Sequence, residues 1–421
     1  MHSIYPTFLW QCDKFLTTPD LPDELLRKVK QNDELEKNLF DMEEVRNTEE
    51  VLIKALSEEV IANWAIEGIQ LNTAAVRSSI IRHCGMSLPV WNPPGNRDYR
   101  DEINAVATTL SFYREPLKKM SADILCDVNA RLAPADVRFN NEGKPLVENA
   151  PNVWGQIRVT GIQVAERYSG KAVFIGPNPG DAKAMLDKFS EWWNRDRGKI
   201  PSAVFAALAH LYFVNIHPFG DGNGRTARIL AEKVVPKEDS IFRTYSLSAE
   251  ILHRQRDYYT ALDKVRSPES SKIFVNYILD RQHDAIQTSI TLIDRKREQK
   301  RFWEKYKEEH FSPNQKYMLD SMILSLTDEI WDGSRIARGN IPEAFSELRD
   351  LEKRGFLKKG KFRRDLIPPE NSKSNTQAPA FAKTNNIKRT MANADPSDEK
   401  TSKVNAKATE SEQNESQGWS R

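Results

Sequence analysis

The apolar positions of this chain recur mostly with the period of an α-helix. Within residues 1–95, leucines and valines return every three or four positions, as at Leu25, Val29 and Leu56. Such spacing gives each helix one apolar stripe that must be buried against a neighbour. Similar stripes run through four later segments, 103–113, 121–132, 179–193 and 201–213. We therefore predict a mainly α-helical protein that begins with a helical domain at 1–95.

Two short runs interrupt this helical pattern. Ile162–Ala165 and Ala172–Ile175 are rich in apolar and β-branched residues, and the turn-forming sequence Tyr168–Lys171 lies between them. Such an arrangement is typical of a β-hairpin. The helix that follows carries Phe189, Trp192 and Trp193. We expect these aromatic side chains to belong to the core.

The main chemical signal lies between two helical segments. Residues 201–213 have the composition of a buried helix, and helical spacing returns at 226–232. Gly222, Asn223 and Gly224 therefore fall at the start of the second helix. Its first N–H groups have no partner within the helix, and the helix dipole favours an anion there. Glycines let the backbone approach that anion closely.

Charged residues flank these glycines at useful spacings. Arg225 and Arg228 lie three apart on one helical face and can both donate to phosphate oxygens. Asp221 supplies the single carboxylate with which Mg²⁺ is often held next to phosphates. His217 can accept a hydroxyl proton near neutral pH. The alternative is an ordinary glycine-rich turn between two helices.

The run from His217 to Arg228 resembles the motif of the Fic family, His-Pro-Phe-x-(Asp/Glu)-Gly-Asn-Gly-Arg-x-x-Arg, at every defined position. The resemblance implies a Fic catalytic core at 96–285 that transfers AMP from ATP to a protein hydroxyl. His217 would be the base and Asp221 the Mg²⁺ ligand. Nucleotide binding would fall to five residues of the loop and helix: Gly222, Asn223, Gly224, Arg225 and Arg228.

Two further segments resemble parts of this family. Tyr258 and Tyr259 are similar to residues on the adenine side of the nucleotide, although both could equally be core residues. The hairpin at 162–176 resembles the flap on which a target protein docks as an added strand. The alternative is a hairpin that only covers the core.

The segment Asn63–Gly68 resembles the inhibitory motif (Ser/Thr)-x-x-x-Glu-(Gly/Asn), with Asn63 replacing Ser or Thr. The resemblance implies that Glu67 pairs with a nucleotide-binding arginine and blocks the γ-phosphate. We expect Asn63 to hold Glu67 more weakly than Ser or Thr would. The alternatives are a surface glutamate that precedes a helix-ending glycine, and a Glu67 that positions water for AMP removal at the same site.

The last third of the chain is divided differently. Residues 286–310 read as a basic linker helix. Residues 311–369 contain two helical segments and a basic strand-like run, which together resemble a winged helix-turn-helix. DNA binding is therefore one hypothesis, but the second helix carries Glu343, Glu347, Asp350 and Glu352. We favour protein interaction, including a homodimer. Residues 370–421 are too polar to fold alone.

Composition adds few constraints. The 62 basic and 60 acidic residues leave a net charge of +2. So small a net charge does not indicate a protein that attracts nucleic acid or an acidic surface. No apolar run approaches the roughly 18 residues of a membrane span. The three cysteines show no metal-binding spacing. We expect a cytoplasmic enzyme without membrane contact. The alternative hypothesis, from a different functional class, is a DNA-binding regulator whose core only senses nucleotide.

Overall fold

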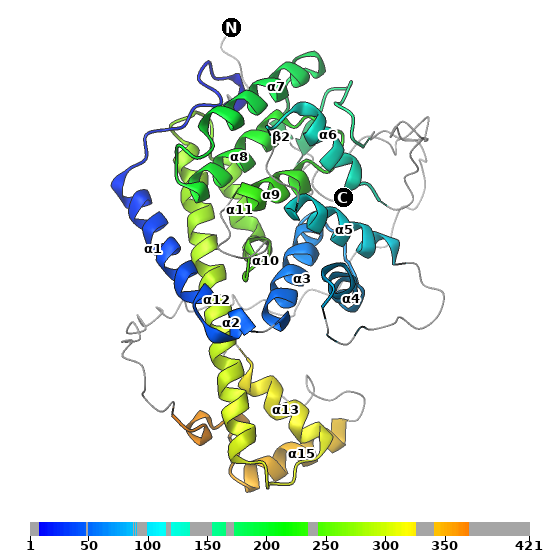
Figure 1. Ribbon diagram of the computed structural model, residues 1–421, viewed down its shortest axis with the longest axis vertical. Helices are drawn as coiled ribbons and strands as arrows, with labels where there is room; N and C mark the ends of the chain where they lie inside the picture. Colours follow the sequence, from blue (N-terminus) through cyan, green and yellow to red (C-terminus); the bar gives the residue numbers. More distant parts are fainter. Residues whose placement is uncertain are drawn as a thin grey trace, which may run out of the picture. The chain divides into compact units, whose positions relative to one another are not determined.

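The computed structural model describes residues 8–47, 49–86, 88, 90, 99–114, 119–134, 154–165, 172–234, 243–325 and 341–369. Contacts divide the chain into two compact units, the larger reaching Arg297 and the smaller beginning at Glu298. The prediction of a mainly α-helical fold is confirmed (Figure 1). Among the described residues, no helix is both long enough and apolar enough to cross a membrane.

In the ranges that the structure describes, the larger unit contains helices and one hairpin. The first elements are η1 (Leu9–Gln11), α1 (Asp23–Phe40), α2 (Glu43–Asn47), α3 (Glu49–Ala65), α4 (Thr73–Cys84), α5 (Arg100–Arg114) and α6 (Ala122–Arg131). They are followed by β1 (Gln163–Ala165), β2 (Ala172–Ile175), α7 (Pro179–Asp196), α8 (Ser202–Ile216), α9 (Asn223–Val234), α10 (Leu247–His253) and α11 (Gln255–Asp263). Helix α12 (Ser271–Lys305) begins here and passes into the smaller unit.

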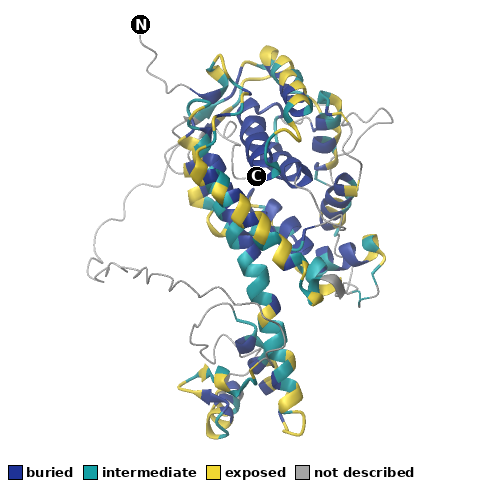
Figure 2. Ribbon diagram, turned by 60° about the vertical axis from the view of Figure 1, so that its left-hand side comes forward, coloured by how far each residue is buried: buried dark blue, intermediate teal, exposed yellow. Residues whose placement is uncertain are grey.

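Helix α8 is the centre of the larger unit. Apart from Ser202, every side chain along it is buried, because apolar residues face every side of the helix. Figure 2 shows this concentration of buried residues in the helices at the middle of the unit. Trp192 of α7 stacks on Phe205 of α8 with ring centroids 4.6 Å apart. The predicted core role of these aromatic residues is confirmed.

Local sequence explains where several helices begin and end. The side chain of Asn72 accepts the N–H of Ala75 at 2.9 Å and caps α4. Gly85 ends the same helix with φ of 64°. Ser246 caps α10 in the same way, accepting the N–H of Ala249 at 3.0 Å. These capping contacts set the helix boundaries that position the site.

The predicted hairpin is confirmed as an antiparallel pair of β1 and β2. Its turn at 166–171, the predicted boundary at 95/96 and the predicted tail at 370–421 lie outside the described residues. The predicted linker helix 286–310 corresponds to the second part of α12, which starts at Ser271 inside the predicted core and ends at Lys305. Helical spacing continues through residue 286, so no feature of the sequence marks a domain boundary inside this helix.

The smaller unit contains α13 (Pro313–Ile323), α15 (Ile341–Lys353), β3 (Leu357–Lys358), β4 (Lys361–Phe362) and η2 (Arg364–Leu366). Its core forms around Phe302 of α12, whose ring lies 6.0 Å from Phe356 and 5.4 Å from Phe362. Two helices and a hairpin therefore appear in the predicted order. The assignment as a winged helix stays a prediction.

Candidate functional site

The loop that joins α8 to α9 begins at His217. This residue has φ of 48° and ψ of 57°, and its N–H still bonds to the carbonyl of Phe213 at 3.0 Å. Left-handed backbone is uncommon outside glycine and costs about 1 kcal/mol or more. It reverses the chain at the end of α8 and places the imidazole at the start of the loop.

The hydrogen bonds of His217 fix its tautomer. Nδ1 lies 3.1 Å from the carbonyl oxygen of Val214, which can only accept, so Nδ1 carries the proton. Nε2 is therefore left with its lone pair. Burial lowers the pKa of His217 to about 4, because the charged imidazolium would be poorly solvated. At neutral pH this side chain is an unprotonated base.

The side chain of Asn223 braces the loop. Its oxygen accepts the N–H of Phe219 at 3.0 Å, and its nitrogen donates to the carbonyl of Phe219 at 2.8 Å. Phe219 itself is fully buried, 6.0 Å from the ring of Phe213. Both ends of the Asn223 amide are thus used within the loop. The group it offers to a ligand is its backbone N–H, at the start of α9.

At two positions of the loop and helix start, close neighbours leave little room for a side chain. Gly222 has φ of 77°, and a Cβ there would lie 2.5 Å from Trp154 and 2.8 Å from Asn129. A Cβ on Gly224 would overlap the carboxylate of Glu67. Any side chain at either position would displace a neighbour that shapes the site.

Arg225 and Asp221 form a partly buried ion pair across one turn. The distance from Nη2 of Arg225 to Oδ1 of Asp221 is 3.1 Å, and the guanidinium lies 4.9 Å from the ring centroid of Trp154. Burial raises the pKa of Asp221, and the nearby Arg225 opposes that shift. The Asp221 side chain is 25% exposed, so its carboxylate is accessible from the loop.

Asp221 fits a magnesium site in which the protein supplies a single carboxylate. Among the described residues, no group of three or more His, Cys, Asp or Glu side chains could hold a metal ion. A divalent ion here would depend on one carboxylate together with the oxygens of a bound phosphate. Mg²⁺ is commonly held in this way.

Arg228 is held by the end of α3. Its Nε donates to Oδ1 of Asn63 at 2.5 Å, and its Nη2 donates to the backbone carbonyl of Asn63 at 3.0 Å. Nη2 also pairs with Oε1 of Glu67 at 2.5 Å. The expected pairing of Glu67 with a motif arginine is present in the structure. The alternative of a surface glutamate is wrong, because the residue is only 6% exposed.

The expectation for Asn63 needs correction. We expected its side chain to hold Glu67, but Oδ1 instead bonds to Arg228. Asn63 and Glu67 therefore act on the same arginine.

Contacts with two helices fix the end of α3. The carboxylate of Glu59 accepts the hydroxyl of Ser246 at 2.8 Å and the N–H of Ser248 at 3.0 Å, both next to the start of α10. The carbonyl of Ile66 accepts the side chain of Gln255 on α11 at 2.7 Å. Asn63 and Glu67 are thus presented to Arg228 by an anchored helix end.

The two tyrosines differ in position. Tyr258 is fully buried, and its hydroxyl lies 2.9 Å from Nε2 of His210. This pair makes both residues part of the core. Tyr259 is half-buried, and its hydroxyl donates to the carbonyl of Ile66 at 3.4 Å. A role for Tyr259 beside a nucleotide base stays a prediction.

Two positioning residues were missed from sequence. Arg158 donates to the carbonyl of His217 at 2.7 Å and to that of Pro177 at 2.6 Å, so it joins the hairpin's flank to the loop. Asn129 donates to the carbonyl of Asp221 at 2.9 Å. Both act on backbone atoms far away in sequence. No motif in the sequence indicated either residue.

Two donors in this site remain unsatisfied. Nε of Arg225 and Nη1 of Arg228 are buried and make no hydrogen bond to the described residues. Buried donors without a partner are rare and costly. They lie next to the start of α9, where the backbone N–H groups also favour an anion. The site can therefore bind a polyanion beside an unprotonated imidazole.

Comparison with known proteins gives two family matches. Residues 119–235 match the model of the Fic/DOC family, and residues 2–86 match a domain of unknown function, DUF4172. The protein adenylyltransferase Fic of Drosophila mojavensis is 35% identical over 107 residues, and that of Culex quinquefasciatus is 32% identical over the same length. Each match covers 25% of this chain and 20% of the relative. The chain thus spans about a fifth of the length of these curated relatives.

A solved structure supports the same fold. A Fic family protein from Desulfovibrio desulfuricans G20 aligns with a TM-score of 0.50 at 17% identity. The alignment covers 81% of this chain and 93% of that protein.

Proposed function

Through residues 119–235 the chain is a Fic family protein, and we propose that it transfers AMP from ATP to a Ser, Thr or Tyr hydroxyl of another protein. The observation that carries this proposal is that one loop-and-helix segment, residues 217–228, holds both the unprotonated Nε2 of His217 and the buried, unsatisfied donors of Arg225 and Arg228. A site that only sensed nucleotide would need the arginines but no base. The names of the curated relatives agree with this activity.

The proposed reaction is a single displacement at the α-phosphorus of ATP. The acceptor hydroxyl oxygen forms a bond to that phosphorus, and the bond to the bridging oxygen of the β-phosphate breaks. Pyrophosphate leaves with the electron pair of that bond. Nε2 of His217 takes the hydroxyl proton, while Nδ1 stays bonded to the carbonyl of Val214, which keeps the ring oriented.

Electrostatic stabilisation would come from groups that are already in place. The N–H groups at the start of α9 and the free donors of Arg225 and Arg228 would bind phosphate oxygens. Asp221 would hold Mg²⁺ against the phosphates, which supplies further positive charge as pyrophosphate leaves. The ion pair of Asp221 with Arg225 keeps that carboxylate oriented in the meantime.

We also propose that Glu67 inhibits the enzyme. Nη2 of Arg228 cannot serve both Glu67 and a phosphate, and the site is too buried for water to replace the lost partner. ATP that is denied this contact would bind with its α-phosphate misplaced for in-line attack. The contact between Arg228 and Glu67 would inhibit transfer to any target protein.

Labelled ATP tests the proposed activity. The Glu67→Gly variant, which lacks the proposed inhibitory carboxylate, is incubated with Mg²⁺ and ATP labelled either at the α- or at the γ-phosphate, together with lysate proteins. AMP transfer leaves only the α-label on protein, and the Asp221→Ala variant should lose it. Retention of the γ-label would indicate phosphoryl transfer and would contradict the proposal, as would the absence of any protein-bound α-label.

A further inference from the structure

The register of the hairpin determines which backbone groups point outward. The N–H of Gly176 bonds to the carbonyl of Ile162 at 3.0 Å, and the next pair is Gln163 opposite Ile175. Hydrogen-bonded and non-bonded pairs alternate along an antiparallel ladder. The N–H and C=O groups of Gln163 and Ile175 therefore point away from the hairpin, on its two outer edges.

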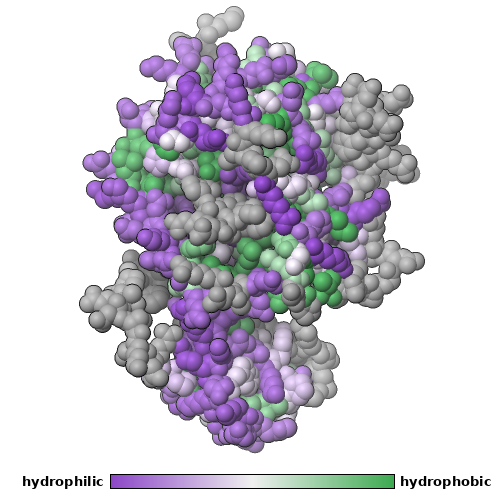
Figure 3. Space-filling model, viewed as in Figure 1, coloured by the Kyte–Doolittle hydropathy of each residue, from purple (hydrophilic) through white to green (hydrophobic). Residues whose placement is uncertain are grey.

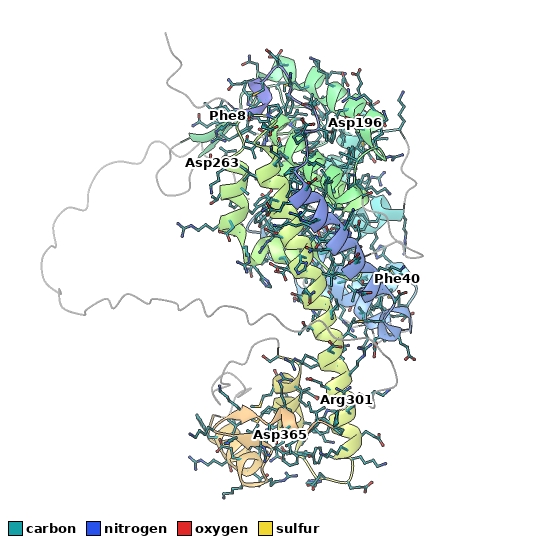
Figure 4. All side chains as sticks on the ribbon, turned by 90° about the vertical axis from the view of Figure 1, so that its left-hand side faces the viewer. Phe8, Phe40, Asp196, Asp263, Arg301 and Asp365 are labelled. Carbon is teal, nitrogen blue, oxygen red and sulfur yellow. The ribbon has the colours of Figure 1, made fainter. Side chains whose placement is uncertain are left out.

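The outer edge of β2 is covered by the N-terminal segment Phe8–Gln11. The indole nitrogen of Trp10 donates to the carbonyl of Ile175 at 2.8 Å. The ring of Phe8 meets Phe174 edge-on at 5.3 Å, and Phe174 in turn lies 5.7 Å from the imidazole of His217. Figure 4 shows Phe8 beside the hairpin strands. One continuous row of rings thus connects this segment with the proposed base.

The rest of the N-terminal region anchors this segment. The hydroxyl of Tyr212 on α8 donates to the carbonyl of Thr17, and the rings of Tyr212 and Phe15 are 5.5 Å apart. The guanidinium of Arg266 lies 5.7 Å from the ring centroid of Phe8. The cover on β2 is therefore attached to the helix that ends at His217.

The outer edge of β1 is different. Gln163 is exposed, and its outward backbone groups bond to nothing in the described part of the chain. An extended polypeptide can add to such an edge through main-chain hydrogen bonds.

We propose that the segment Phe8–Gln11 is a fixed part of the acceptor site, which closes the edge of β2 and leaves β1 as the edge that receives the target. Trp10 and Phe8 are then positioning residues, because they hold β2 and Phe174 against His217. The target would have to present its hydroxyl from an extended segment that pairs with Gln163. This inference rests on the proposed function.

The test compares two acceptors in one reaction. Each enzyme variant is built on Glu67→Gly and incubated with Mg²⁺ and α-labelled ATP. The polypeptide acceptor is a size-tagged, full-length His217→Ala chain, and water is the second acceptor. Label on the tagged chain and released AMP are both measured, and their ratio reports how well the site presents a polypeptide.

Gln163→Pro removes the outward N–H of β1 without taking a bond from the hairpin, since that group points away from β2. We expect the ratio of polypeptide-bound to released AMP to fall about five- to tenfold, as for the loss of one hydrogen bond. The matched control Gln163→Ala keeps the N–H and should keep the ratio. Trp10→Ala should not raise it.

The opposite pattern would overturn the inference. If Trp10→Ala raises the ratio severalfold and Gln163→Pro leaves it unchanged, the target uses β2, and Trp10 only occupies its place. Thermal unfolding shows whether each variant is folded. If Trp10→Ala does not fold, the comparison of Gln163→Pro with Gln163→Ala alone decides whether the target uses β1. If the Glu67→Gly parent labels no polypeptide, the proposed function fails, with or without AMP release.

Discussion

The side-chain oxygen of Asn63 lies 2.5 Å from Nε of Arg228, and the backbone carbonyl of Asn63 accepts from Nη2 of the same arginine at 3.0 Å. Arg228 is therefore held by Asn63 independently of its ion pair with Glu67. All of these groups are buried, where hydrogen bonds to a charged group are worth more than at the surface. Two residues of one helix end thus bind one guanidinium, and the proposed nucleotide would have to compete with them for it.

Glu67→Gly is expected to raise self-modification with AMP. The substitution removes the carboxylate that occupies Nη2 of Arg228, so that a phosphate oxygen can bind there. A charged hydrogen bond of ~1.5–3 kcal/mol corresponds to an increase of roughly 10- to 150-fold. Incorporation of α-labelled ATP into the protein measures the change. The gain must disappear when Glu67→Gly is combined with His217→Ala. If Glu67→Gly alone is no more active than wild type, the proposed inhibition by Glu67 is contradicted.

Asn63→Ala should increase the activity of Glu67→Gly further. After Glu67 is removed, Oδ1 of Asn63 still binds Nε of Arg228 and restrains the guanidinium. We expect a gain of about two- to tenfold over the single variant, which corresponds to one hydrogen bond. ATP affinity, measured by calorimetry, should rise in parallel. If the double variant labels no faster than Glu67→Gly, Asn63 serves only to position α3.

His217→Ala is expected to abolish transfer and to preserve ATP binding. The ring contacts the carbonyl of Val214 and the Phe174 ring, whereas the proposed phosphate ligands are other residues. Loss of a general base lowers rates by roughly 10²–10⁴-fold. Single-turnover labelling in the Glu67→Gly background measures the rate, and calorimetry measures the ATP affinity. Unchanged transfer would remove His217 from the mechanism.

The pH dependence of transfer should reflect the buried state of His217. Burial lowers its pKa to about 4, so the ring stays unprotonated as the pH falls from 7 to 5.5. The transfer rate of Glu67→Gly should then change by less than about twofold, whereas a base with an ordinary pKa would lose about tenfold. Rates are measured at saturating ATP, with far-UV circular dichroism to show that the protein is folded. A tenfold loss would contradict the expectation.

The smaller unit is not expected to recognise a DNA sequence. Acidic residues of α15 are used within the unit, because Glu347 accepts the hydroxyl of Ser312 at 2.8 Å and Asp350 accepts the side chain of Gln315 at 2.8 Å. They would also repel phosphates. The face of this unit that Figure 3 draws is largely hydrophilic. Residues 341–366 of its sequence carry both acidic and basic side chains.

Selection from a random duplex library, with the full chain at physiological salt, tests this expectation. We expect no enriched site. Nanomolar binding to one site over random duplex would contradict the prediction and favour a regulator.

Much of the site could be predicted from sequence because its residues are close together in the chain. Two helices joined by a glycine-rich loop place His217, Asp221, Arg225 and Arg228 near one another whatever the rest of the fold does. The hairpin could also be predicted, because strand pairing across a short turn is local. The length of α12 could not, because helical periodicity carries no mark of where one unit ends.

The sequence by itself determined the helical class, the loop and the nature of its chemistry, since spacing and residue type act over a few turns of chain. Only the tertiary structure decided which distant residues contact the loop. It brought Asn63 to Arg228 across 165 positions, joined Arg158 to His217, and placed Trp10 on the edge of β2. These contacts depend on how helices and loops pack around α8. Packing is fixed by the whole core together, so no local pattern records it.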